Sequence, residues 1–148
     1  MDFRDYLPVA FTLANGGTEA EWRSGTSRAY YAAFHVAREL LSDLGFIVPR
    51  AERSHGYVWI RLANSGETTV KNAGNDLNAL RGHRNRADYD PHRTLNQVLA
   101  LGNVQLARGI INALDAAAIE PVRSQITAVM RDYERNILKD VTWQPPPP

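Results

Sequence analysis

An arginine interrupts the apolar face of a predicted helix over residues 67–89. Apolar residues there recur at alternating steps of three and four, as on one side of a helix: Val70, Ala73, Leu77, Leu80 and Ala87. Arg84 falls on the same side, so the sequence places a permanent positive charge where a hydrophobic contact is expected. Because an unpaired charge in apolar surroundings is strongly unfavourable, a carboxylate, carbonyl, phosphate or second subunit has to meet the guanidinium.

The periodicity is helical along the whole chain, which divides into about five or six helices. A first helix over Phe3–Ala14 ends at Asn15-Gly16-Gly17, and a capping box at Thr18–Glu21 begins a long helix that Gly45 closes. Later helices are predicted over Ser54–Leu62, over Glu67 to about Tyr89, from Thr94, and from Pro121. The sequence therefore predicts an all-α domain over residues 1–140, followed by a flexible Trp- and Pro-rich tail over 141–148.

The apolar positions of these helices predict the core. The long second helix is expected to bury Tyr30, Phe34, Ala37, Leu41 and Leu44, and Trp59 is expected to join them. The helix from Thr94 is expected to bury Leu95, Val98, Leu99, Leu106, Ile110 and Leu114. The last helix is expected to bury Val122, Ile126, Val129, Tyr133 and Ile137.

Composition narrows the classes of function. With 17 Lys and Arg residues against 16 Asp and Glu, the net charge of +1 argues against avid, nonspecific nucleic-acid binding by bulk charge. Only two of the basic residues are lysines, and arginine suits bidentate recognition of phosphate or carboxylate. The absence of cysteine, of a leader-like N-terminus and of a long apolar run predicts a cytoplasmic protein without a membrane span.

Common catalytic motifs are missing. The four histidines, His35, His55, His83 and His92, lack metal-ligand spacing, and no cysteine completes a zinc site. Gly16-Gly17 lacks the lysine and the preceding strand of a phosphate-binding loop. The sequence therefore predicts no metal and no cofactor.

A constellation of polar residues surrounds Arg84 at the end of its helix. It consists of Arg84, Asn85, Asp88, Tyr89 and His92, flanked by His83 and Arg86. Arginine stabilises negative charge, asparagine orients a phosphate oxygen, and histidine moves protons near neutral pH. These types fit a metal-independent ribonuclease in which the RNA 2′-hydroxyl is the nucleophile.

A purely structural interpretation explains the same residues. Arg84 would pair with Asp88 one turn later, Asn85 and Asp90 would end the helix, Tyr89 would be core, and His92 would lie in an exposed loop. The polar row of the long helix, which includes Arg28, Tyr31 and His35, is likewise either a solvated surface or the wall of a cleft.

Two stretches resemble proteins with a HEPN domain. They are Ser27–Leu41, with its Arg-Ala-Tyr-Tyr-Ala-Ala-Phe-His run, and Arg84–Tyr89, which reads Arg-Asn-Arg-Ala-Asp-Tyr. The resemblance covers roughly residues 3–119. It implies an up-and-down helical bundle, usually a homodimer, in which the arginine motifs of two subunits meet across a cleft. Arg84 and Asn85 match the first half of the family's catalytic pattern, but Tyr89 stands where its histidine is expected, and His92 lies further along.

Many HEPN proteins are metal-independent ribonucleases that serve as toxins in toxin–antitoxin or phage-defence systems, often beside a nucleotidyltransferase antitoxin. The resulting hypothesis assigns the scissile phosphate to Arg84 and Asn85 and proton transfer to His92 or Tyr89. Arg28, Tyr31, His35, His83, Arg86 and Asp88 are the predicted substrate-binding residues. One alternative is a non-catalytic module that binds a nucleotide, a nucleic acid or the nucleotidyltransferase. Another is a structural partner whose cleft is closed by Asp88 of the opposite subunit.

Overall fold

The computed structural model describes all 148 residues, and every regular element in it is helical. The elements are η1 (Phe3–Asp5), α1 (Tyr6–Ala14), α2 (Glu19–Leu44), α3 (Arg53–Ala63), α4 (Thr68–Tyr89), α5 (Gln97–Ala117), α6 (Val122–Tyr133) and the π-helical η2 (Glu134–Leu138). This confirms the predicted all-α bundle of five to six helices. None of the helices has both the length and the hydropathy needed to cross a membrane.

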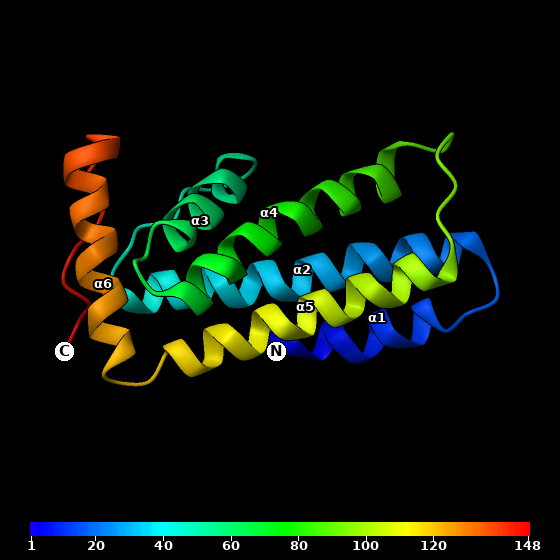
Figure 1. Cartoon of the computed structure of the whole chain (residues 1–148), viewed down its shortest axis with the longest axis horizontal. Helices are drawn as coiled ribbons and strands as arrows, with labels where there is room; N and C mark the ends of the chain where they lie inside the picture. The colour runs from blue at the N-terminus through cyan, green and yellow to red at the C-terminus, as the bar shows by residue number, and fades with distance from the viewer.

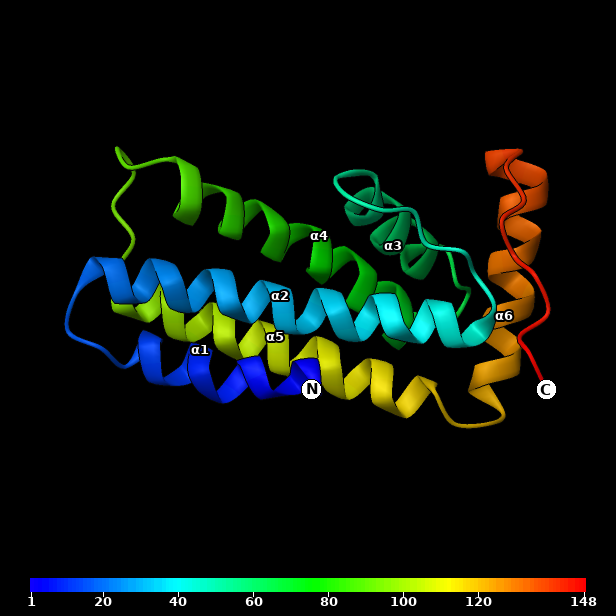
Figure 2. The same ribbon diagram turned by 180° about the vertical axis from the view of Figure 1, so that it is seen from behind.

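Helix α2 is the centre of the bundle. It packs against α1 and α5 in one layer, and α4 lies over α2 and α5 with α3 beside it (Figure 1). The chain alternates in direction through α1, α2, α4 and α5, whereas α6 stands across one end, as the view from behind also shows (Figure 2). The end of α4 that carries Arg84 therefore lies far from α6.

Local sequence explains why α2 is a single long helix. The Thr18 hydroxyl accepts a hydrogen bond from the Glu21 amide at 3.2 Å, as a helix N-cap does. Gly45 ends the helix in the left-handed conformation, with φ of 107°. Gly25 lies within α2 and leaves it unbroken. A Cβ there would lie 2.9 Å from the Ala10 carbonyl oxygen, so glycine allows α1 to approach α2 closely.

The caps of α4 fix the position of Arg84. The Glu67 carboxylate accepts a hydrogen bond from the Val70 amide at 2.8 Å, and the helix ends at Tyr89, just before Asp90 and Pro91. The predicted face of this helix is buried throughout: Val70, Ala73, Leu77, Leu80, Arg84 and Ala87. The structure therefore confirms that Arg84 points inward.

Part of the predicted core is wrong. Helix α5 begins at Gln97 rather than Thr94, and Val98 and Leu99 face solvent, with Val98 78% exposed. The buried face of α5 consists of Ala100, Asn103, Val104, Ala107, Ile110, Ile111, Leu114 and Ala117. In α6 the buried residues are Ile126 and Met130, while Val129 and, beyond the helix, Ile137 are exposed. Trp59 lies at the edge of the core, only partly buried.

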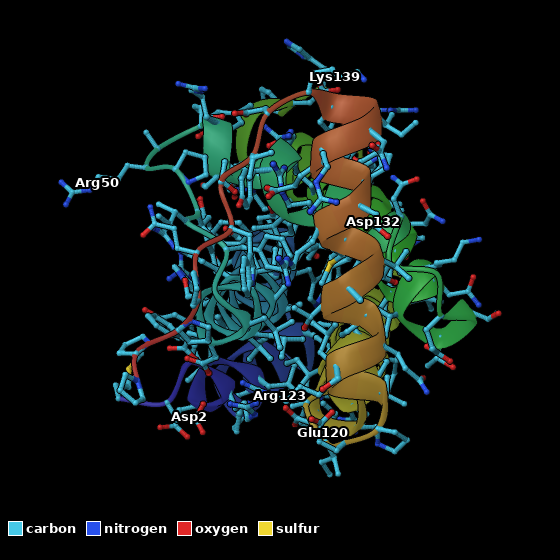
Figure 3. All side chains as sticks on the ribbon, turned by 90° about the vertical axis from the view of Figure 1, so that its left-hand side faces the viewer. Asp2, Arg50, Glu120, Arg123, Asp132 and Lys139 are labelled. Carbon is cyan, nitrogen blue, oxygen red and sulfur yellow. The ribbon has the colours of Figure 1, made fainter.

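The end of the chain packs on the bundle before its prolines begin. Figure 3 shows α6 rising from near Glu120 to Lys139, after which the chain runs back beside it. The Trp143 indole donates to the Leu44 carbonyl at 2.7 Å, and the Gln144 amide donates to the Gly45 carbonyl at 2.9 Å. Trp143 and Gln144, within the predicted tail over 141–148, are therefore held against the end of α2, and Pro146 lines a pocket with Leu44 and Trp143.

Candidate functional site

The guanidinium of Arg84 packs against two neighbouring aromatic rings. Its Cζ atom is 5.1 Å from the ring centre of Tyr30 and 5.2 Å from that of Tyr31, both on α2. The nearest carboxylate is Asp88, at 3.9 Å from Nη1, and this carboxylate also accepts a 3.1 Å hydrogen bond from Ser27. The Arg84 Nε–H is buried without a hydrogen-bond partner, so the charge is only partly compensated within one chain.

The arginine is also closed off from solvent. Only 4% of Arg84 is exposed, so a phosphate in solution has little access to the guanidinium of this single chain. The hypothesis that Arg84 binds a scissile phosphate therefore needs a rearrangement or a second subunit. Within one chain, Arg84 of α4 contacts Tyr30 and Tyr31 of α2 and lies 3.9 Å from Asp88.

A buried histidine stands behind Tyr30, and the sequence analysis gave it no role. His55 on α3 lies 2.5 Å from the Tyr30 hydroxyl through its Nδ1 atom, and its ring stacks on Phe34 at 4.5 Å. Burial, followed by the charges of Arg81 and Arg84, lowers the pKa of His55 to about 4. Burial also raises the pKa of Tyr30. His55 is therefore neutral at pH 7, and its hydrogen bond fixes the ring against which Arg84 packs.

An aromatic row runs along the open side of α2, and we define it as Phe3, Tyr6, Arg28, Tyr31 and His35. The His35 ring stacks on Phe3 at 4.0 Å and lies 6.0 Å from Tyr31. The Arg28 guanidinium lies 5.4 Å from the ring centres of both Tyr6 and Tyr31. All five side chains are half-buried, which leaves part of each flat surface accessible.

The row is joined to Arg84 through Tyr31, which touches both. Burial, followed by the charges of Arg38 and Arg28, lowers the pKa of His35, so its ring is neutral near pH 7. The structure thus brings the predicted residues Arg28, Tyr31 and His35 together with Arg84 and Asp88 on one side of the bundle.

The remaining predicted catalytic residues lie at the exposed end of α4. Asn85 and His92 face solvent, and Tyr89 is 75% exposed, so the alternative that Tyr89 belongs to the core is wrong. The backbone amide of His92 donates to the Asp90 carboxylate at 3.3 Å. These residues are accessible to a large ligand such as RNA.

Arg23 of α2 fastens the loop that carries His92. Its guanidinium donates hydrogen bonds to the carbonyl oxygens of Arg86, Ala87, Asp90 and Arg93. It also pairs with Glu19 at 2.9 Å, so its charge is compensated. A single side chain thereby closes the C-terminal end of α4 and ties residues 90–93 to the start of α2.

His83 and Arg86 lie on a different side of α4 from Arg84. They line a pocket of about 410 Å³ together with residues of α2, of the loop before α5, and of α5 itself: Arg23, Arg93, Thr94, Leu95, Leu99 and Asn103. The Arg86 Nη2 atom lies 2.7 Å from His83 Nδ1. The ten predicted site residues therefore fall into two groups, eight on the Arg84 side or at the exposed helix end and two in this pocket.

No group of three or more histidine or acidic side chains is arranged to hold a metal ion. No protein-family model matches the chain, and comparison with curated proteins and with solved structures likewise gives no match. The fold class, an all-α bundle of six helices, and the arrangement of the side chains are therefore the basis for assigning a function.

Proposed function

We propose that this chain is a HEPN-type protein that acts on single-stranded RNA along the aromatic row and the exposed end of α4. The observation that carries the proposal is the row itself, in which the rings of Phe3, His35 and Tyr31 follow one another, with Arg28 against Tyr31 and the partly compensated charge of Arg84 beside it. Unpaired RNA bases stack on aromatic rings and on arginine planes, while the same arginines attract the phosphates. Such a surface needs no bulk positive charge, which agrees with a net charge of +1.

The proposed reaction is metal-independent cleavage of the RNA backbone. The RNA 2′-oxygen forms a bond to the adjacent phosphorus as the bond from phosphorus to the 5′-oxygen breaks, which leaves a cyclic phosphate and a 5′-hydroxyl. In this proposal His92 takes the 2′-hydroxyl proton or supplies one to the leaving oxygen, with Tyr89 beside it. The Asn85 amide orients a phosphate oxygen.

A homodimer would supply what one chain lacks. In this proposal the Arg84 sides of two copies face each other, so that a phosphate or the second subunit compensates the charge and the unpartnered Nε–H. The expected biological setting is a toxin–antitoxin or phage-defence system. A small nucleotidyltransferase antitoxin is the proposed partner.

One observation favours a non-catalytic binding module as the second candidate. Burial lowers the pKa of His55, which lies beside Tyr30, and of His35, which lies beside Tyr31. His55 is also hydrogen-bonded to Tyr30. Of the four histidines, only His92, just beyond the end of α4, is exposed. In this candidate the row binds RNA or a nucleotide and no bond is broken.

An RNA assay in EDTA tests the proposal. The substrate is a single-stranded oligoribonucleotide with a 5′-hydroxyl, and the readouts are fluorescence anisotropy for binding and gel electrophoresis for cleavage. His92→Ala should lower the cleavage rate by about 100-fold or more and leave binding intact. Tyr31→Ala should weaken binding by about tenfold, the loss of one stacking contact. Arg108→Ala, an exposed α5 substitution far from the row, is the control.

Three results separate the candidates. Cleavage in EDTA that depends on His92 supports the ribonuclease. Binding that depends on Tyr31 without any cleavage supports the non-catalytic module. The absence of RNA binding by the unmodified protein, or equal binding by the Tyr31→Ala variant, contradicts both.

A further inference from the structure

The pocket between α4 and α5 is separate from the aromatic row and remains unassigned by the proposed function. It lies where the end of α4 passes over the start of α5, at the right of Figure 1. Three of its eight lining side chains are arginines, Arg23, Arg86 and Arg93, and none is acidic. In a chain whose charges are nearly balanced, a concave lining with three arginines and no acidic side chain is a local excess of positive charge.

Not all of this charge is free. Arg23 forms an ion pair with Glu19 and donates hydrogen bonds to backbone carbonyl oxygens. Arg86 and Arg93 have no carboxylate within ion-pair distance, so two uncompensated guanidinium groups remain at the pocket. Two guanidinium groups can provide several charge-assisted donors to the oxygens of one phosphate.

A histidine adds a neutral donor. Arginine can only donate, so the 2.7 Å contact between Arg86 Nη2 and His83 Nδ1 requires Nδ1 to be the acceptor. The ring proton of His83 is then on Nε2, where it is available to a ligand. Burial, followed by the charge of Arg86, lowers the pKa of His83, which agrees with a neutral ring at pH 7.

The apolar residues that line the pocket favour a nucleotide over a simple anion as the ligand. Leu99 is 53% exposed on the first turn of α5 and lines the pocket together with Leu95. An exposed leucine beside two free arginines offers an apolar surface next to an anion site. The start of α5, a helix of 21 residues, also directs the positive end of its dipole toward this region.

We propose that this pocket binds the terminal phosphate of a nucleotide or of an RNA 5′-end, with Arg86, Arg93 and His83 on the phosphate and Leu99 against the attached nucleoside. Both sources present the same phosphate monoester. The site is independent of the aromatic row, so its success or failure does not depend on the proposed ribonuclease.

Calorimetric titration with AMP, adenosine and inorganic phosphate tests the proposal. Titration with two RNA oligonucleotides, one with a 5′-phosphate and one with a 5′-hydroxyl, shows whether the bound phosphate belongs to a free nucleotide or to an RNA 5′-end. AMP should bind more tightly than either adenosine or phosphate alone. Arg93→Ala should weaken AMP binding by about tenfold, the loss of a charge-assisted hydrogen bond, because the Arg93 side chain has no other partner. Leu99→Ser should weaken binding of AMP but not of inorganic phosphate. Arg108→Ala, also an exposed arginine, should change nothing.

Tighter binding of AMP identifies a free nucleotide as the ligand, and tighter binding of the 5′-phosphorylated RNA identifies an RNA end. The proposal is overturned if adenosine binds as tightly as AMP, or if the Arg93→Ala and Arg108→Ala variants bind both phosphate ligands equally. Cleavage of the 5′-hydroxyl RNA should persist in Leu99→Ser, so failure of this pocket is distinguishable from failure of the ribonuclease.

Discussion

Aromatic rings, rather than acidic groups, hold the buried Arg84. The guanidinium packs against Tyr30 and Tyr31, while Asp88 approaches only to 3.9 Å and is itself bound by Ser27. A cation beside aromatic faces gains on the order of 1–2 kcal/mol, which offsets only part of the cost of desolvating the charge. The residue is therefore better explained by function than by stability.

This difference can be measured by replacing Arg84 with methionine and with alanine. Arg84→Met keeps a long side chain against the rings of Tyr30 and Tyr31 but removes the positive charge. The free energy of unfolding should therefore stay within about 1 kcal/mol of that of the unmodified protein. Arg84→Ala leaves a cavity and should cost about 2–4 kcal/mol. Urea denaturation followed by circular dichroism gives both values. Equal losses in the two variants would show that the charge itself fastens α4 to α2.

The sequence predicted the burial of Arg84 but not its surroundings. Helical periodicity within α4 was enough to place this residue inward, since the neighbouring apolar positions define the face. The contact between His55 and Tyr30 joins α3 to α2, and its geometry depends on how the two helices pack. The relative position of two packed helices cannot be predicted from a single sequence. The only available signal was that both residues fall on inward faces of their own helices.

At the scale of helices, glycines that face a neighbour differ from those that face solvent. Gly25 lets the α1 backbone approach α2, with a hypothetical Cβ 2.9 Å from the Ala10 carbonyl oxygen and 3.0 Å from the Ala14 amide nitrogen. Gly102 on α5 has nothing within 4 Å of the same position. Because both glycines are helical, they form a matched pair.

Alanine at these two positions should therefore have opposite effects. Gly102→Ala should stabilise the protein by about 0.5–1 kcal/mol, because alanine favours the helix. Gly25→Ala gains the same propensity but must push α1 away from α2, so the net change should be a loss of about 1–3 kcal/mol. Thermal unfolding by calorimetry measures both, and stabilisation by Gly25→Ala would mean that α1 is free to shift.

The helices also show why boundaries are easier to predict than buried faces. The cap at Thr18 and the stop at Gly45 are local signals, and both lie where the sequence predicted them. On α5 the large residues Val98 and Leu99 were expected inside, but α5 packs through alanines and Asn103, which hydrogen-bonds Thr26 of α2 at 3.2 Å. Small residues permit close helix packing and contribute little to a hydrophobic pattern, so the pattern wrongly placed Val98 and Leu99 inside, although it placed Ile110 and Leu114 correctly.

At the scale of the whole molecule, one buried ion pair joins α3, η2 and the end of the chain. The Glu134 carboxylate is fully buried, pairs with Arg61 at 2.8 Å, and accepts hydrogen bonds from the amides of Thr142 and Trp143. Burial alone would raise the pKa of Glu134, but the hydrogen bonds of Thr142, Arg61 and Trp143 outweigh it and hold the pKa below 4.5, its ordinary value.

Removing the charge should loosen this end of the molecule. Glu134→Gln leaves Arg61 buried without a counter-charge and should cost about 3 kcal/mol at pH 7. Because the pKa of Glu134 is lower in the folded state than in the unfolded state, its contribution is complete above pH 4.5 and is lost as the pH falls through the folded value. Urea denaturation at pH 7 and pH 3 should therefore show a smaller difference between variant and unmodified protein at pH 3.

The exposed pair of Asp132 and Arg135 provides the control. Both side chains are more than half exposed, so Arg135→Gln should change the free energy of unfolding by less than about 1 kcal/mol at either pH. An unchanged difference for Glu134→Gln between pH 7 and pH 3 would contradict the role assigned to the buried carboxylate.

The many bonds of Arg23 have a consequence for motion. The turn after α4 contains exposed residues and a proline, features that usually mark a hinge, yet the carbonyl oxygens of Asp90 and Arg93 are anchored from α2. This turn is therefore a rigid extension of the bundle. A ligand that reaches His92 meets a group whose backbone is already in place, and so loses little binding energy to ordering it.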